Sequence, residues 1–273
     1  MIWTKLPWHL LAFSAPLVLE LVTISDFSTT AQAQTRTPTQ INPDQRLKTV
    51  RFEPRKDQPA PTYTVGGGKR GTCEKNPQAS EPATEPLPLD PSLTPLLRSP
   101  LTDPQLTVSA RPTFLVYVPQ TSAKAVEFTL LLRDKDGSEK KIYQTSVNLT
   151  GTPGIVSISL PATAPELEIG KDYEWRVAMA CQTGEVNVVD PNDPFAEALI
   201  RRIQPDSSLS QIDRAKPLDR VALYAKEGVW FDAVANLAAL LKSQPNDPQV
   251  ASAWKELLQG AGLGEIANAP LMN

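Results

Sequence analysis

The sequence predicts an α+β protein, an antiparallel β-sandwich of immunoglobulin-like character followed by a helical tail. Between residues 111 and 203, short β-branched and aromatic segments recur about every ten residues and end at turn-forming residues, a spacing typical of such sandwiches. After residue 204, apolar residues recur at spacings of three and four, which indicates helices. The predicted parts are a signal peptide (1–33), a proline-rich linker or extended arm (34–110), the β-sandwich domain (111–203) and a C-terminal helical segment (204–273).

The N-terminus has the features of a signal peptide. Its apolar run extends from Leu10 to Val22, which is shorter than the about 20 residues that a membrane span needs. Small residues follow at Ala31 and Ala33, so we expect cleavage between Ala33 and Gln34. An uncleaved anchor is the alternative. Cleavage predicts a periplasmic or secreted protein with no integral membrane span.

Composition excludes most histidine chemistry. The one histidine, His9, lies in the expected signal peptide, so a Ser–His–Asp or Cys–His catalytic arrangement cannot be built. The usual zinc and non-haem iron sites also depend on imidazole. We therefore expect no catalytic residue, no metal ligand, no cofactor and no enzymatic activity. A pair of carboxylates suited to glycoside hydrolysis remains possible on composition.

The balance of charge argues against nucleic acid as a partner. The chain has 27 basic and 30 acidic residues and a formal net charge of −3, which is too balanced for a nucleic-acid or anionic-membrane surface. The expected partner is an unidentified protein or cell-envelope component.

Two cysteines, Cys73 and Cys181, remain in the expected mature chain. In an oxidising compartment an even count favours one disulfide between them. Two buried free thiols, or a bond to another chain, are the alternatives.

A glycine-rich segment precedes the first cysteine. Thr62–Val65 alternates like a short strand, and three glycines then lead to Lys69. A phosphate-binding loop would need Ser or Thr after the lysine, whereas Arg70 follows here. The segment instead predicts a tight turn that brings Cys73 to its partner. Farther along the arm, leucines between residues 87 and 106 predict an irregular segment laid over a sheet.

The β-region contains five predicted strands. They are Thr113–Val118, Ala125–Leu132, Lys140–Leu149, Gly154–Leu160 and the strand with Tyr173, Trp175 and Val177.

A hairpin turn is predicted at Asp134–Gly137, between the second and third strands. A calcium loop is the alternative, but Glu139 follows Gly137 by two residues, and the EF-hand spacing requires six.

The fifth strand is expected to be central to the core. Tyr173, near its start, resembles the tyrosine corner of immunoglobulin-like and fibronectin type III sandwiches, whose hydroxyl bonds to nearby backbone. Trp175 and Val177 would then be core residues, and the strand leads to Cys181.

The pattern weakens after Cys181. Residues 185–189 could form a sixth strand, and 195–203 is ambiguous between a strand and a short helix. Asp190 and Asp193 are interpreted as a helix cap in preference to ligands.

The tail has three amphipathic stripes. The segment from Tyr224 to Pro245 resembles a tetratricopeptide hairpin, and Trp230 and Trp254 are predicted core residues. Because about three repeats are needed to bury a solenoid core, the tail must dock on the β-region or on a partner. A peptide-binding groove is the alternative role for its aromatic stripe.

Several motifs together resemble the cyanobacterial domain-of-unknown-function 928 family. They are Gly66–Cys73, Pro112–Phe114, Tyr117–Pro119, Gly151–Ser157, Gly170 with Tyr173 and Trp175, Cys181, Leu223–Ala225, Gly228–Ala233, and Trp254 with Leu257 and Leu258. The resemblance implies an exported cyanobacterial-type protein with both cysteines as family features. It implies no activity.

These observations favour a non-enzymatic binding or structural module of the periplasm or cell envelope. The alternative is a carbohydrate-binding or carboxylate-based carbohydrate-active protein. That alternative requires exposed aromatic rings, for which Tyr117, Tyr173 and Trp175 are the candidates. A purely architectural body would instead lack an exposed apolar patch.

Overall fold

The computed structural model describes most of the chain after residue 49. The described residues are 50–56, 68–69, 73, 92–98, 103–133, 138–150, 152–181, 190–210 and 212–272. All of them belong to one compact unit, Arg46–Asn273, which is distinct from Met1–Gln45.

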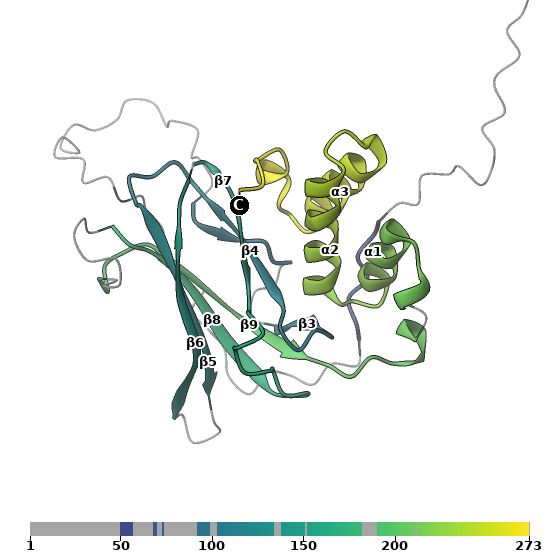
Figure 1. The fold of residues 1–273 in the computed structure, drawn as a ribbon, viewed down its shortest axis with the longest axis horizontal. Helices are drawn as coiled ribbons and strands as arrows, with labels where there is room; N and C mark the ends of the chain where they lie inside the picture. Colours follow the sequence, from purple (N-terminus) through teal and green to yellow (C-terminus); the bar gives the residue numbers. More distant parts are fainter. Residues whose placement is uncertain are drawn as a thin grey trace, which may run out of the picture. The chain divides into compact units, whose positions relative to one another are not determined.

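A mixed sheet of six strands is the largest element of this unit (Figure 1). Its strands are β1 (Gly68–Lys69), β3 (Gln105–Thr107), β5 (Ala125–Arg133), β6 (Glu139–Asn148), β8 (Asp172–Met179) and β9 (Phe195–Arg202). The order β1-β9-β8-β5-β6 is antiparallel throughout, and β3 pairs in parallel with the C-terminal half of β9. Two short segments of the arm therefore pair with the edge of β9 that faces away from β8. This pairing protects the edge of the sheet from pairing with other chains.

The alternation of side chains along β8 defines the two faces of this sheet. Tyr173, Trp175 and Val177 are buried in the core cluster, while Glu174 and Arg176 point to the opposite face because successive side chains alternate along a strand. We refer to this opposite face of β5, β8 and β9 as the outer face.

A second, antiparallel sheet lies against the inner face. It has the order β2-β4-β7, with β2 at Thr94–Pro95, β4 at Thr113–Val118 and β7 at Gly154–Ser159. Phe114 of β4 packs 4.7 Å from the Phe128 ring and 5.0 Å from the Trp175 ring, centroid to centroid. These rings join the two sheets.

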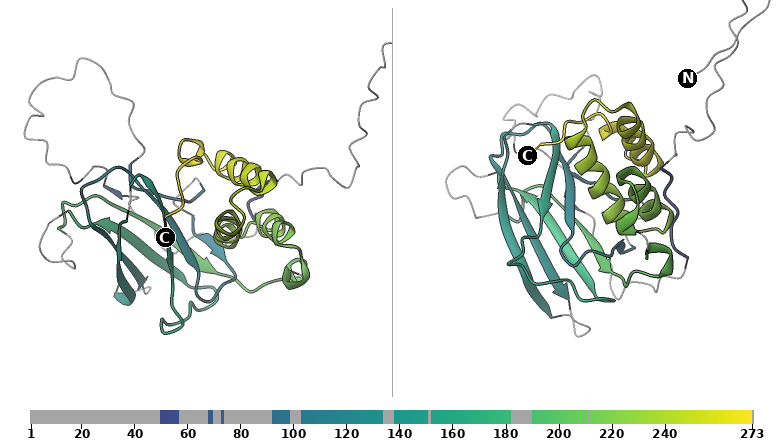
Figure 2. Two further views of the ribbon diagram at one scale, coloured as in Figure 1. Left: turned by 45° about the horizontal axis from the view of Figure 1, so that its top comes forward. Right: turned by 45° about the vertical axis from the view of Figure 1, so that its right-hand side comes forward.

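Three α-helices form the tail and lie together on one side of the sheets (Figure 2). They are α1 (Pro217–Lys226), α2 (Trp230–Ser243) and α3 (Pro248–Gly260), with short 3₁₀ helices at Ser207–Leu209, Ile212–Arg214 and Gly264–Ile266. Gly228 reverses the chain between α1 and α2 with φ of 70°, a conformation that favours glycine. None of the described helices is long and apolar enough to cross a membrane.

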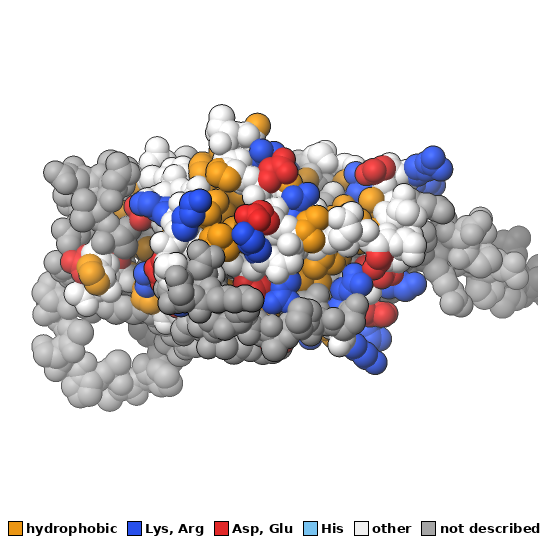
Figure 3. Space-filling view, turned by 90° about the horizontal axis from the view of Figure 1, so that it is seen from below, with side chains coloured by type: hydrophobic (Ala, Val, Ile, Leu, Met, Phe, Trp, Pro, Cys, Tyr) orange, Lys and Arg blue, Asp and Glu red, His pale blue; other side chains and the backbone are white. Residues whose placement is uncertain are grey.

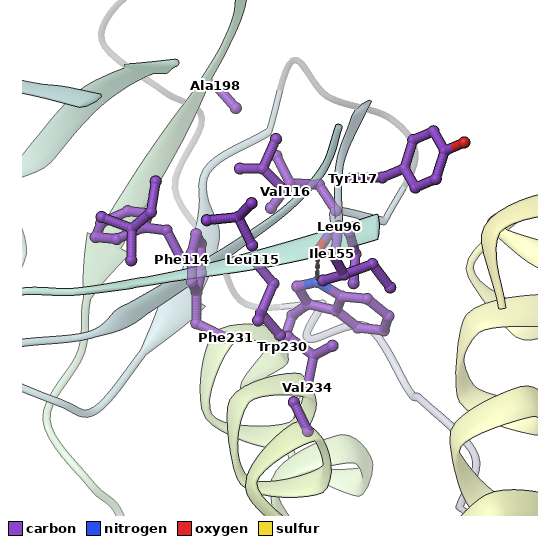
Figure 4. Packing of buried hydrophobic residues seen from close by; sticks show 14 of the residues in the cluster. Leu96, Phe114, Leu115, Val116, Tyr117, Ile155, Ala198, Trp230, Phe231 and Val234 are labelled. Atoms are coloured by element: carbon purple, nitrogen blue, oxygen red, sulfur yellow. Dashed lines mark hydrogen bonds between the residues drawn. The ribbon is translucent and has the colours of Figure 1, made fainter. Parts of the chain in front are cut away.

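The tail docks on the β-region. The ring centroid of Phe231 in α2 lies 5.3 Å from that of Phe114 and 6.2 Å from that of Trp175. The indole Nε1 of Trp230 donates a hydrogen bond of 2.8 Å to the carbonyl of Leu96 (Figure 4). One continuous core thus contains side chains from both sheets and the helices.

A buried carboxylate forms a polar contact within this junction. Asp232, in the first turn of α2, is 8% exposed. One of its oxygens accepts hydrogen bonds from the Thr107 hydroxyl at 2.8 Å and from the Val108 amide at 3.0 Å. Desolvation raises the pKa of Asp232 to about 6, although these donors act in the opposite direction.

The predicted disulfide joins Cys73 to Cys181, with Cα atoms 4.9 Å apart and a sequence separation of 108. The arm therefore returns to the end of β8. Nearby, Gly68 of β1 lies so close to β9 that a Cβ at this position would be 2.3 Å from the Phe195 carbonyl oxygen. Glycine permits this approach.

The structure confirms the α+β class, with two mostly antiparallel sheets and helices. It corrects one expectation. Residues Phe195–Arg202 form strand β9, so Asp190 and Asp193 do not cap a helix. The reason is that every residue from Phe195 to Arg201 pairs with β8. The signal peptide (1–33) and the segments predicted at 62–65, 134–137 and 185–189 lie outside the described residues.

Candidate functional site

The residues predicted to form the core are buried. Tyr173, Trp175, Val177, Trp230 and Trp254 are each at most 2% exposed. The Trp254 indole donates to the Ala267 carbonyl at 3.1 Å, within the tail. These side chains stabilise the fold and are not available to a ligand.

Burial also removes the aromatic rings that a sugar site was expected to use. Tyr117, Tyr173 and Trp175 are all buried. The Tyr173 hydroxyl accepts a hydrogen bond of 3.0 Å from the Glu168 amide, and desolvation raises the pKa of Tyr173. Stacking of a sugar requires an accessible ring face, so none of the three can provide one.

The outer face of the large sheet carries paired charges. At one end, Arg201 of β9 forms two hydrogen bonds of 2.5 and 2.8 Å with the carboxylate of Asp172, the residue opposite it in β8. Next to this pair, Glu174 contacts Arg133 of β5 at 3.0 Å. Burial raises the pKa of Glu174, and the nearby guanidinium of Arg133 partly opposes this effect.

The other end of the outer face contains a cavity of about 300 Å³. Its walls come from β5, β8, the start of β9 and the loop before β9. The lining residues are Glu127, Thr129, Leu131, Arg176, Ala178, Asp190, Pro191, Asp193 and Phe195. This volume is at the lower end of the range for small-molecule sites, roughly 300–1,000 Å³.

The loop before β9 is held in place by its own aspartates. The Asp190 amide donates to a carboxylate oxygen of Asp193 at 2.9 Å, and the Asn192 amide donates to Asp190 at 2.7 Å. At the end of the loop, the Met179 amide donates to the Pro194 carbonyl at 2.9 Å. These contacts keep Asp193 buried at the edge of the cavity, where an acidic side chain would otherwise be exposed to water.

Arg176 is the basic residue of the cavity wall. Its guanidinium carbon lies 3.7 Å from the centroid of the Phe195 ring, a cation–π contact. Its Nε is 3.6 Å from the carboxylate of Glu197. The positive charge of Arg176 is thus stacked on an aromatic ring and close to a carboxylate.

The groups in the cavity wall can form hydrogen bonds and ion pairs with a ligand. The wall offers carboxylates, one guanidinium, one aromatic ring and the hydroxyl of Thr129. Among the described residues, no group of three His, Cys, Asp or Glu side chains could hold a metal ion.

Most large hydrophobic side chains among the described residues are buried or partly buried. Ile169, which is 50% exposed, is the one large hydrophobic side chain that is exposed among the described residues. A view from below shows hydrophobic side chains, in orange, between acidic and basic ones on that side (Figure 3).

Sequence reasoning did not find the cavity, because its walls are distant in the sequence. The available signals were the polar side chains of Glu127 and Thr129, which alternate with apolar residues in β5, and the aspartates at 190 and 193. Recognising them as one site required the pairing of β5 with β8 and of β8 with β9.

The chain matches the model of one protein family. The model of the family described as Domain of Unknown Function (DUF928) matches residues 65–271. No curated protein sequence matches the chain. The family match spans both cysteines, both sheets and the helical tail, which is well over half of the chain. The chain therefore belongs to the DUF928 family.

Proposed function

We propose that this protein is a non-enzymatic, exported binding module whose binding surface is the outer face of the six-stranded sheet. The observation that carries the proposal is the cavity of about 300 Å³ on that face, with polar groups from two strands and one ordered loop. Concave sites with a few converging polar groups are the usual places for ligands.

Other features of the sequence support the compartment and the lack of enzymatic activity. The single histidine lies at position 9, within the proposed signal peptide, and cleavage after Ala33 would remove it. The disulfide between Cys73 and Cys181 is typical of proteins in oxidising compartments. An exported, cyanobacterial-type protein of the periplasm or cell envelope, without cofactor or integral membrane span, is therefore our proposal. Immunoblotting of cell fractions tests this proposal. The exported chain should begin at Gln34 and should therefore migrate faster than the uncleaved chain.

The finer architecture belongs to the same proposal. The hydrogen bond from the Glu168 amide to the Tyr173 hydroxyl supports an immunoglobulin-like tyrosine corner. The helical pair α1 and α2, which turns at Gly228, supports a tetratricopeptide-like hairpin.

The binding role is tested by filling the cavity. Thr129 lies in its wall, so Thr129→Phe should exclude a ligand whatever its chemistry. Gln259→Phe is the matched control, because Gln259 is exposed on α3 and lies outside the cavity. Both variants must retain the melting temperature of the wild type within about 3 °C.

Affinity purification from cell-envelope extracts is then compared across the three proteins. The wild type and Gln259→Phe should enrich the same component, and Thr129→Phe should recover at least about tenfold less, which corresponds to about 1.4 kcal/mol. Equal recovery by all three proteins, or no component above the level of a mock purification, would refute the proposed role.

A carbohydrate ligand is the second candidate. Because Tyr117, Tyr173 and Trp175 are buried, it would depend on the Phe195 ring and the three carboxylates that line the cavity. Its weakness is that Arg176 already stacks on the Phe195 ring. Calorimetry with soluble cell-wall glycan fragments tests this candidate, and heats equal to those of dilution would exclude it.

A further inference from the structure

We propose that the cavity on the outer face binds an organic cation, namely an ammonium or guanidinium group with a short aliphatic stem. This inference rests on the proposed function and names the ligand class for that site. Such a group could belong to a free small molecule or to a basic side chain of a partner.

The first argument is the imbalance of charge in the cavity wall. Three carboxylates, from Glu127, Asp190 and Asp193, line the cavity together with one guanidinium, that of Arg176. The charge of Arg176 is offset by Glu197 at 3.6 Å. A cation in the cavity would reduce the net negative charge of its walls.

The second argument is the state of Asp193. Asp193 is only 6% exposed, yet its side chain lines the cavity. One carboxylate oxygen accepts a hydrogen bond of 2.9 Å from the Asp190 amide. Its other oxygen makes no hydrogen bond to the described residues and is not one of the fully buried atoms that lack a partner. An ammonium or guanidinium ligand in the cavity can donate hydrogen bonds to this oxygen.

Glu127 adds a third, independent acceptor. It is half-buried in β5, and its carboxylate makes no ion pair or hydrogen bond with the described residues. It faces Ala178 across the β5–β8 pair, and this small side chain leaves room above the sheet.

The geometry distinguishes an organic cation from other ligands. A metal ion would need at least three clustered ligands, and none of the described acidic residues form such a group. An anion would meet three carboxylates and a single guanidinium that is already engaged. A planar or extended cation can contact carboxylates that are spread along a wall, because its donors are also spread.

The experiment is isothermal titration calorimetry on the purified chain with its disulfide intact, at fixed ionic strength. The probes are agmatine, which represents a free cation, and acetyl-Gly-Arg-Gly-amide, which represents a basic side chain. Calcium chloride and sodium acetate serve as the metal and anion comparisons. At least one cationic probe should bind saturably, and calcium and acetate should not.

Isosteric variants assign the binding to this cavity. Asp193→Asn keeps an acceptor for the Asp190 amide but removes the charge, so it should weaken affinity at least about tenfold. Glu127→Gln, a second variant outside the loop, should weaken affinity about threefold or more. Asp103→Asn is the control, because Asp103 is exposed and does not line the cavity, and it should bind as the wild type does.

The outcomes distinguish a free small molecule from a protein partner as the source of the cation. They also distinguish failure of this inference from failure of the proposed function. Tighter binding of agmatine supports a small molecule, and tighter binding of the peptide supports a protein partner. The inference is overturned if neither probe binds, if calcium binds equally well, or if both acidic variants bind like the wild type. If Thr129→Phe loses an envelope component while neither cationic probe binds, the proposed function stands and this inference fails.

Discussion

Replacement of the buried carboxylate between helix α2 and strand β3 should change how stability depends on pH. Asp232 is 8% exposed and accepts hydrogen bonds from Thr107 and Val108. Asp232→Asn retains the shape of the side chain and an oxygen acceptor, but it cannot ionise. The variant therefore isolates the effect of the charge.

The magnitude follows from the pKa of this group. Desolvation raises the pKa of Asp232 from its ordinary value of 3.8 to about 6 in the folded state. Between these two values the folded chain binds more protons than the unfolded chain, so this group's contribution to stability is present at low pH. The contribution is lost as the pH rises through about 6. Between pH 4.5 and 7.5 the loss amounts to about 2 kcal/mol of unfolding free energy.

The assay is urea unfolding, followed by the fluorescence of the buried tryptophans, on both proteins at the two pH values. The unfolding free energy of the wild type minus that of Asp232→Asn should be about 2 kcal/mol larger at pH 4.5 than at pH 7.5. Other titrating groups, such as Glu174, are present in both proteins and cancel in this difference. A difference that is the same at both pH values would show that burial does not control the protonation of Asp232.

Three further predictions concern the fold. Replacement of Cys73 and Cys181 by serine should lower the unfolding free energy by about 3–5 kcal/mol, because the disulfide closes a long loop; urea unfolding under oxidising conditions measures this, and equal stability of the two proteins would contradict it. Gly68→Ala should displace β1, since its Cβ would meet the main chain of β9 at 2.3 Å; faster hydrogen exchange at the start of β9 would show this, and unchanged exchange would exclude it. Tyr173→Phe leaves a turn amide without its acceptor and should cost about 1 kcal/mol in chemical denaturation, whereas no loss would indicate that water replaces the hydroxyl.

Much of the β-region could be predicted from local pattern. The alternation of Val126, Phe128 and Leu130 with polar residues predicts strand β5 and its buried face, and the structure has both. The pairing of the two cysteines is expected from their even number and the predicted export of the chain, and the bond is present. Such signals depend on residues that are close in the sequence or few in number.

The arrangement of the arm could not be predicted in the same way. Strand β3 has three residues, Gln105–Thr107, and its parallel pairing with β9 depends on contacts nearly one hundred residues away. The short strand β2 likewise acquires its conformation from β4. Isolated segments of two or three residues have no periodicity to detect.

The candidate site was also beyond local pattern. Sequence pattern alone favours a helix cap for the aspartates at 190 and 193, because an ambiguous apolar segment follows these turn residues. Pairing with β8 makes that segment a strand, and the same loop then becomes a wall of the cavity. Tertiary pairing thus decided both the secondary structure and the role of these residues.

The covering of β9 by the arm has a consequence for the order in which the molecule can assemble. Both β1 and β3 precede the β-region in the chain, but their partner β9 is the last strand of the large sheet to be synthesised. The edge of the sheet can close only after residue Arg202 has become available. Long-range pairings of this kind slow folding, because the ends of large loops must meet before the contacts form. A nascent chain with this topology therefore stays incompletely folded until most of its length has been made.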